Sequence, residues 1–143
     1  MKVIMVGFGV VGRALTRLIQ ARMGDLNRNH DMNLKIIAIA DSKSLAIDRA
    51  GLKLGRILSL KETKDVVGPE TAEDTLSIIE ESDADVVVEL TPTDPRTGEP
   101  GLEYMTEALK SGKSVVTANK GPLVTAYPNL RKLADKNGVQ LKY

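Results

Sequence analysis

The first twenty-three residues constrain the fold more than any other part of the sequence. Residues Lys2 to Val6 form a near-continuous apolar run, which is typical of a strand buried on both faces. From Val10 to Met23 the apolar side chains recur with a helical period. Gly7 and Gly9 lie between these runs and Gly12 lies near the start of the second, in G-x-G-x-x-G spacing. The segment therefore predicts a strand, a tight turn and a helix in direct succession.

In that position the three glycines favour binding of a dinucleotide. Gly7 allows the tight turn, Gly9 lets the backbone approach a pyrophosphate, and Gly12 lets the helix pack against the strand. The N-terminus of the helix supplies unpaired N–H groups and a positive dipole for the phosphates. Glycines also mark purely structural turns, but the position inside a strand–helix–strand unit favours the ligand-binding interpretation.

The rest of the chain continues the alternation of strands and helices. Strands are predicted at 34–40, 85–90, 114–117 and 139–143, and helices at 70–81, 102–109 and 123–135. The less regular segments are predicted as a polar loop at 25–33 with His30 on the surface, a broken helix at 44–60 and a charged loop at 61–65. Such alternation predicts a Rossmann-type, doubly wound α/β fold, with a mainly parallel sheet and helices on both faces. We expect residues 1–143 to form one domain.

Composition excludes several classes of partner. The chain has 143 residues, a formal net charge of +1 and only 3% aromatic residues, so neither a basic surface nor base-stacking platforms for nucleic acid are indicated. Its apolar N-terminus is too short for a membrane span. The absence of cysteine removes disulfides and thiolate ligands, and fits a reducing compartment, so we expect a cytoplasmic protein with no metal.

Asp41 follows the second predicted strand, with Ser42 and Lys43 beside it. A carboxylate here can accept hydrogen bonds from the hydroxyls of the adenosine ribose, and the alternative is a turn or helix cap. Lys43 could neutralise a 2′-phosphate, whereas Asp41 would repel one. The cofactor is therefore predicted as NAD or NADP without a preference.

A polar loop follows the strand that ends at Glu89. Because ligands of parallel sheets lie outside the carboxyl ends of the strands, Thr91 and Pro92 are predicted to line the nicotinamide side of the crevice. Thr93 and Asp94 are interpreted as a turn, and Glu89 as a buried carboxylate held by backbone donors rather than a catalytic acid.

The sequence TANKGP places Asn119 and Lys120 at the same edge, after the strand 114–117. An exposed lysine beside a helix is the ordinary alternative, but at the ligand edge Lys120 is better placed to meet a substrate. Its ammonium could stabilise charge on a carbonyl oxygen or donate a proton to it. Lys120 is the candidate catalytic residue, and Asn119 and Lys120 are both candidate cofactor contacts.

GFGVVGRAL, ADS and the stretch from VVVELTPTDP to TANKGPL together resemble the cofactor-binding region of homoserine dehydrogenase along essentially the whole chain. The resemblance implies NAD(P)-dependent interconversion of L-homoserine and L-aspartate 4-semialdehyde, in the route to threonine, methionine and isoleucine. By that likeness Lys120 matches the active-site lysine of the TANK motif. Phe8, Val10 and Val11 match positions whose backbone wraps the pyrophosphate.

In that family a substrate and dimerisation domain follows, whereas this sequence ends at Tyr143 in a predicted strand. The resemblance thus implies a cofactor domain that is inactive alone, and a homodimer formed through the absent domain. Two other hypotheses are a regulatory nucleotide-sensing domain and the cofactor domain of another amino-acid dehydrogenase. Neither requires the combination of TPTDP and TANKGPL.

Overall fold

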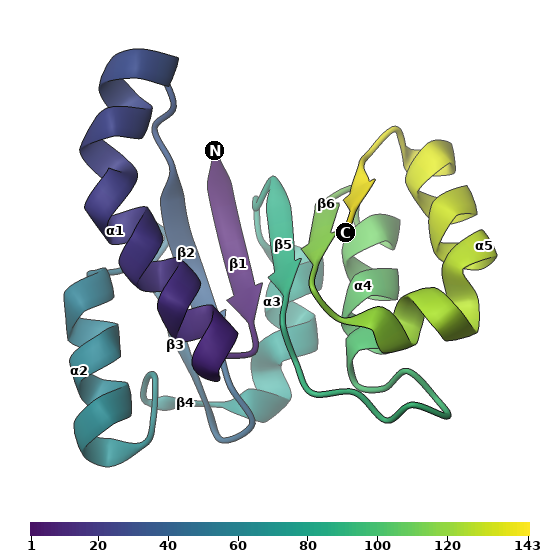
Figure 1. Cartoon of the computed structure of the whole chain (residues 1–143), viewed down its shortest axis with the longest axis horizontal. Coiled ribbons are helices and arrows are strands. Elements are labelled where there is room, and N and C mark those ends of the chain that lie inside the picture. Colours follow the sequence, from purple (N-terminus) through teal and green to yellow (C-terminus); the bar gives the residue numbers. More distant parts are fainter.

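The computed structural model describes all residues from Met1 to Tyr143. Its strands form a single seven-stranded sheet in the order β4-β3-β2-β1-β5-β6-β7 (Figure 1). The strands are β1 (Lys2–Val6), β2 (Lys35–Ala40), β3 (Ser44–Ile47), β4 (Glu70–Thr71), β5 (Val86–Glu89), β6 (Ser114–Thr117) and β7 (Leu141–Lys142). The helices are α1 (Val10–His30), α2 (Leu54–Lys64), α3 (Thr75–Glu81), α4 (Gly101–Lys110) and α5 (Lys120–Asn137), with a 3₁₀ turn η1 at Ala72–Asp74.

The sheet is parallel from β2 through β1, β5 and β6 to β7, and antiparallel where β3 and β4 extend one edge. From β1 the chain first builds outward on one side through β2, and then returns to add β5 on the other side. Ligands of open α/β sheets bind at such a switch point, outside the carboxyl ends of the strands. The prediction of a doubly wound, mainly parallel sheet is confirmed.

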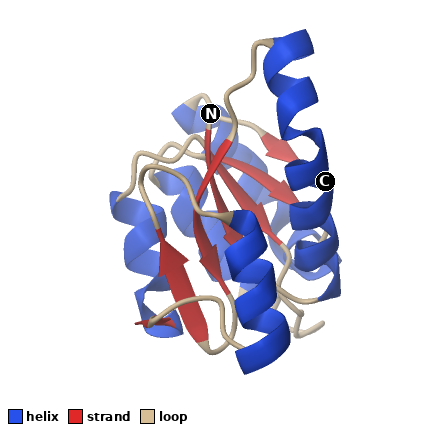
Figure 2. Cartoon of the chain, turned by 90° about the vertical axis from the view of Figure 1, so that its left-hand side faces the viewer, coloured by secondary structure: helices blue, strands red, loops and turns tan.

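The two faces of the sheet are covered by different helices (Figures 1 and 2). On one face β1, β2 and β5 pack against α1 and α2, through buried side chains that include Met5, Ile39 and Ile57. On the other face they pack, with β6 and β7, against α3, α4 and α5, through side chains that include Met105 and Leu130. None of these helices is both long and apolar enough to cross a bilayer.

The prediction of a loop at 25–33 was wrong for most of its length, because α1 continues to His30. This part of the helix extends beyond the sheet (Figure 1) and most of its residues are exposed or half-buried, so it needs no apolar stripe. Local pairs support it instead, since Asn29 Nδ2 donates to Asp25 Oδ1 at 2.6 Å. Asp31, in the left-handed conformation, ends the helix. His30 is exposed, as expected, but it lies on the helix.

The broken helix predicted at 44–60 was also wrong. The chain reverses after Asp41, and β3 pairs antiparallel with β2, so that Ala38 lies opposite Ile47. The run SLAI fits a helix or a strand equally well by spacing, and the turn at Asp41 selects the strand. The helix α2 then begins only at Leu54 and includes most of the charged segment 61–65 that was predicted as a loop.

Other boundaries differ from the prediction as well, and the strand expected at 139–143 is limited to β7 at Leu141–Lys142. The segment expected to be helical from Glu70 forms β4 and the 3₁₀ turn first, and becomes α-helical at Thr75. The last helix starts at Lys120, earlier than expected, because the Asn119 side chain accepts a hydrogen bond from Gly121 N at 3.1 Å and so caps it. It is kinked at Ala126, two residues before Pro128, whose ring disfavours helical geometry in the residues before it.

Candidate functional site

The three glycines of the first turn have different structural roles. Gly7 has a φ of +99°, and a Cβ atom there would overlap the backbone at Leu90, so both the turn and the packing require glycine. A Cβ atom at Gly12 would overlap the carbonyl of Gly7. At Gly9, in contrast, an added Cβ atom would have no other atom within 4 Å. The fold therefore needs Gly7 and Gly12, and it leaves the space above Gly9 open.

The N-terminus of α1 faces that open space without a capping side chain. Gly9 is the N-cap residue, no side chain accepts a hydrogen bond from the first turn, and no acidic residue lies in that turn. The N–H groups at the start of a helix have no partner within the helix. This end of α1 thus presents donors and the positive end of its dipole toward a ligand.

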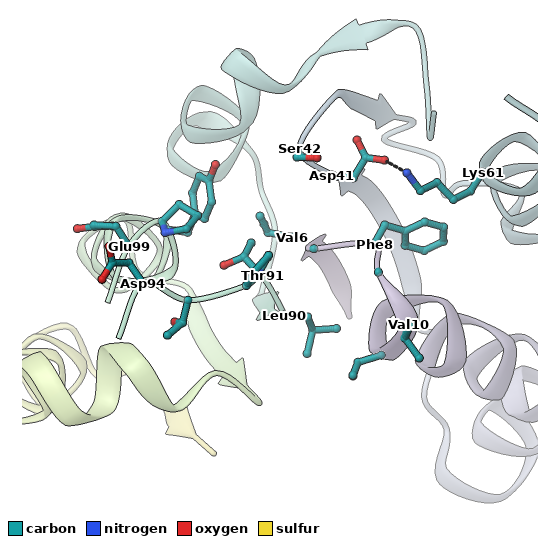
Figure 3. A pocket seen from close by; sticks show the side chains of 17 residues that line it. Val6, Phe8, Val10, Asp41, Ser42, Lys61, Leu90, Thr91, Asp94 and Glu99 are labelled. Carbon is teal, nitrogen blue, oxygen red and sulfur yellow. Dashed lines mark hydrogen bonds and ion pairs between the residues drawn. The ribbon is translucent and has the colours of Figure 1, made fainter. Parts of the chain in front are cut away.

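A cavity of about 740 Å³ lies at the carboxyl ends of β1 and β5, above the switch point of the sheet (Figure 3). Its size is in the range of pockets for small molecules and cofactors. It is lined by Val6, Gly7, Phe8, Gly9, Val10, Val11, Asp41, Ser42, Lys61, Leu90, Thr91, Pro92, Thr93, Asp94, Glu99, Pro100 and Tyr104.

Most of the residues predicted as cofactor contacts line this one cavity. They are Gly7, Phe8, Gly9, Val10, Val11, Asp41, Ser42, Thr91 and Pro92. The side chain of Phe8 is buried in the core, so what Phe8 can offer a ligand is its backbone. Gly12 lies behind the turn, and Lys43, Asn119 and Lys120 are not part of the cavity wall. Contact of any of these residues with a cofactor stays a prediction.

Asp41 lies at one end of the cavity, beside Lys61 (Figure 3). Both of its carboxylate oxygens have partners. Oδ1 accepts hydrogen bonds from the backbone N–H groups of Lys43 and Ser44, each at 2.8 Å. Oδ2 pairs with the Lys61 ammonium at 2.8 Å. Asp41 therefore caps the β2–β3 turn, the alternative noted from the sequence, while it also lines the cavity.

The charges at this end balance one another. Lys61 also pairs with Asp65, and Asp65 pairs with Lys43, so two lysines and two aspartates alternate. Burial alone would raise the pKa of Asp41, but the hydrogen bonds from Lys61 and from the turn outweigh it and hold this pKa below its ordinary value. Hydrogen bonds from Lys43 and Lys61 lower the pKa of the exposed Asp65 carboxyl to about 2.

The opposite end of the cavity is formed by the loop after β5 and by the start of α4. Asp94 and Glu99 lie there, away from Asp41 (Figure 3). Thr93 and Asp94 were interpreted from the sequence as a turn. Asp94 does begin one, because its Oδ1 accepts from Arg96 N and its carbonyl accepts from Gly98 N, each at 2.8 Å. Thr93 precedes that turn, and its hydroxyl donates to Asn119 Oδ1. Both residues line the cavity. Burial raises the pKa of the half-buried Tyr104 phenol, and the negative charge of nearby carboxylates raises it further.

Glu89 is fully buried, as expected, and is surrounded by donors. They include the backbone N–H of Thr91, as expected, but also the side chains of Thr91, Thr117 and Asn119. Next to this cluster, Lys120 is the first residue of α5 and is exposed. The carboxyl edge of β6 thus carries Lys120 beside the cavity rather than in its wall.

Sequence reasoning missed several residues of the cavity wall. Lys61 was placed in a charged loop, and only the helical register of α2 turns its ammonium toward Asp41. Glu99, Pro100 and Tyr104 follow a loop whose path is not visible in a hydrophobic pattern. The signal that could have indicated them is the sequence GEPG, since a Gly-Pro-rich turn before a helix at the ligand edge brings the start of that helix toward the site.

Comparison with known proteins agrees with this geometry. Residues 7–143 match the family model described as "Homoserine dehydrogenase, NAD binding domain". The chain belongs to this family. Membership favours the first of the three hypotheses drawn from the sequence over a nucleotide sensor or another amino-acid dehydrogenase.

Individual relatives of this NAD-binding domain carry the same family name. The chain is 38% identical to homoserine dehydrogenase of Methanocaldococcus jannaschii, over 100% of its own length and 44% of that protein. It is 35% identical to the NAD(+)-dependent homoserine dehydrogenase of Pseudomonas canavaninivorans, over 99% of its own length and 42% of that protein. The crystal structure of a putative homoserine dehydrogenase of Archaeoglobus fulgidus superposes on this chain with a TM-score of 0.86 at 33% sequence identity. The match covers 100% of this chain and 42% of that one. The chain thus spans about two fifths of the length of these relatives.

Proposed function

We propose that this chain binds NAD(H) or NADP(H) across the cavity, as the nucleotide-binding part of a homoserine dehydrogenase. The observation that carries the proposal is the open space at Gly9. Packing explains the glycines at positions 7 and 12, but nothing in the fold requires glycine at position 9. A side chain there would instead fill the space in front of the uncapped end of α1, where a pyrophosphate would meet the N–H groups.

The rest of the cavity suits the two ends of a dinucleotide. The end at Asp41 and Ser42 would hold the adenosine ribose, with Lys43 nearby, and the loop of Thr91 and Pro92 would hold the nicotinamide. The lysines and aspartates at the first end cancel in charge, which supports neither rejection nor strong attraction of a 2′-phosphate. When bound, the nicotinamide would exchange a hydride with the substrate.

The chain's own residues have simpler tasks in the proposed reaction, the interconversion of L-homoserine and L-aspartate 4-semialdehyde. Lys120 would donate a proton to the semialdehyde oxygen as negative charge develops on it, or stabilise that charge. Its exposure at the start of α5 leaves it accessible to a substrate that arrives from outside this chain. Asn119 would fix the turn that carries it, through its cap on Gly121 N.

Replacement of Gly9 tests the proposal. In Gly9→Val the added side chain should leave the melting temperature close to that of wild type, since its Cβ atom contacts nothing within 4 Å. Overlap with a pyrophosphate costs about 1–3 kcal/mol, so NADH affinity, measured by the fluorescence of bound NADH, should fall about tenfold or more.

The matched control is Gly24→Val, near the other end of the same helix, where the change lies far from the cavity. It should leave NADH affinity unchanged. Equal affinity of a folded Gly9→Val variant and wild type would contradict the proposed site.

A further inference from the structure

A buried carboxylate stands between the two loops that the proposed function uses. Glu89 is 0% exposed and ends β5, directly before the loop of Thr91. Its Oε1 accepts hydrogen bonds from Thr91 N at 2.7 Å, from Thr91 Oγ1, and from Asn119 Nδ2 at 3.4 Å. Its Oε2 accepts from Thr117 Oγ1 at 2.8 Å. We call Glu89, Thr91, Thr117 and Asn119 the Glu89 cluster.

No lysine or arginine pairs with this carboxylate. Its charge is stabilised by the donors of the cluster and by the start of α4, which lies against it. A Cβ atom at Gly101, the first residue of α4, would lie 3.0 Å from Glu89 Oε1 and 2.7 Å from Asn119 Nδ2. The positive end of the α4 dipole therefore faces the carboxylate, and only glycine leaves room for it.

The cluster ties together backbone segments that are distant in sequence. Asn119 Nδ2 also donates to Thr91 O at 3.1 Å, and Asn119 N donates to Thr117 Oγ1 at 2.9 Å. Asn119 Oδ1 accepts from Gly121 N and from Thr93 Oγ1. Through these bonds the loop after β5 and the turn that carries Lys120 are held against one carboxylate.

This arrangement is costly to keep in a core. A buried charge needs its full set of hydrogen bonds, and an apolar side chain of similar volume is often at least as stabilising. Glu89 itself is too buried to contact a ligand, and it does not line the cavity, whereas its partner Thr91 does. Glu89 can therefore influence the cavity only through the segments that it holds, the loop after β5 and the turn that carries Lys120.

We propose that Glu89 is a positioning residue that fixes the Thr91 loop relative to the Asn119–Lys120 turn and so shapes the nicotinamide end of the cavity. This inference rests on the proposed function, because it assigns a task within the same site. It concerns one end alone: Asp41 and the glycine turn make no hydrogen bond to the cluster. Loss of the cluster should therefore affect a ligand with a nicotinamide and spare one without it.

The test compares the affinities of NADH and ADP-ribose, which lacks only the nicotinamide. The variant is Thr117→Val, which keeps the shape of a buried side chain outside the cavity wall and removes one donor from Glu89. Wild type should bind NADH more tightly than ADP-ribose. Leaving a buried acceptor without its partner should weaken NADH binding about tenfold and change ADP-ribose binding less than about twofold. The control Thr75→Val, a buried threonine in α3, should change neither affinity.

Unchanged NADH affinity in Thr117→Val, or an equal loss for both ligands, would overturn the inference. If Thr117→Val does not fold, Glu89→Gln decides by the same readout, because a neutral acceptor weakens the bonds to Thr91 while keeping the side-chain shape. It should also show a loss selective for NADH. Wild type that binds neither ligand would contradict the proposed function itself, and the inference would be withdrawn with it.

Discussion

At the scale of single residues, chemistry at the ligand edge is decided by partners that lie far away in sequence. Asp41 was predicted from its place after the second strand, and it does line the cavity. Its pairing with Lys61 was not predicted, because Lys61 follows Asp41 by twenty residues. Between them the chain reverses into β3 and then begins α2, so the pairing depends on where α2 begins. A single sequence shows that a carboxylate ends a strand, but it does not show which lysine will reach it.

The Asp41–Lys61–Asp65–Lys43 network predicts a specific dependence of stability on acid. The pKa of Asp65 is lowered to about 2 in the folded chain, from an ordinary value of 3.8. The unfolded chain therefore takes up the proton first as the pH falls, so the stabilisation from Asp65 is present above about pH 4 and is lost toward pH 2. Asp65→Asn should unfold more easily than wild type at pH 5, and the difference should shrink steadily below pH 4.

Urea unfolding of both proteins at pH 5, 4, 3 and 2 measures that difference. The control is Glu73→Gln, an exposed carboxyl group without an ion pair, which should follow wild type. A gap between Asp65→Asn and wild type that stays constant over this range would show that the network contributes no acid-labile stability.

At the scale of secondary-structure elements, the sequence predicted the elements that the core needs and missed those that the core does not need. The strands β1 and β5 are short apolar runs that are largely buried in the sheet, and β6 is buried at Val115 and Thr117. The positions of all three strands were predicted to within a residue or two. The last turns of α1 are mostly polar and contain no buried residue, so hydrophobic periodicity could not indicate them. The strand β3 is specified by pairing with β2, a contact that local patterns do not encode.

The exposed end of α1 allows a test at this scale. Gly24 lies inside the helix, and a Cβ atom there would meet only the Arg28 side chain, at 3.9 Å. Gly24→Ala should therefore raise the free energy of unfolding by about 0.5–1 kcal/mol, because alanine loses less backbone entropy in a helix.

Gly12→Ala, in the first turn of the same helix, should act in the opposite direction and cost about 1–3 kcal/mol, since its Cβ atom would overlap the Gly7 carbonyl. Urea denaturation of the two variants beside wild type gives both values. If Gly24→Ala destabilised the chain, the distal part of α1 would not be helical in solution.

At the scale of the whole molecule, the topology explains why the candidate residues lie at one edge of the sheet although they come from four separate segments of the sequence. The carboxyl ends of β1, β2 and β5 meet at one edge, so the glycine turn, Asp41 and the Thr91 loop had to lie together once the parallel sheet was predicted. The same reasoning placed Lys120 at this edge, after β6. What it could not give is which residues at that edge form the cavity wall, because that depends on the paths of the loops.

Lys120 lies outside the cavity wall and is exposed, and the chain spans only 44% of its relative from Methanocaldococcus jannaschii. We expect the groups that hold the substrate to lie in the part of such relatives that this chain does not span. The 143-residue chain should then bind NADH but oxidise L-homoserine barely above background, since loss of substrate positioning removes several kcal/mol of barrier lowering.

Joining the chain to the remaining part of that relative should restore turnover, and Lys120→Ala in the joined protein should lower kcat by about 10²–10⁴-fold, the usual contribution of a positioned proton donor. NADH affinity should change much less, because Lys120 does not line the cavity. Lys132→Ala, an exposed lysine farther along the same helix, is the matched control and should leave kcat unchanged. Near-full kcat in Lys120→Ala would make this lysine an ordinary solvated side chain at the start of α5. Efficient oxidation of L-homoserine by the 143-residue chain alone would instead show that this chain already holds the substrate. The ammonium group of L-homoserine would then be expected to contact the acidic end of the cavity, at Asp94 and Glu99.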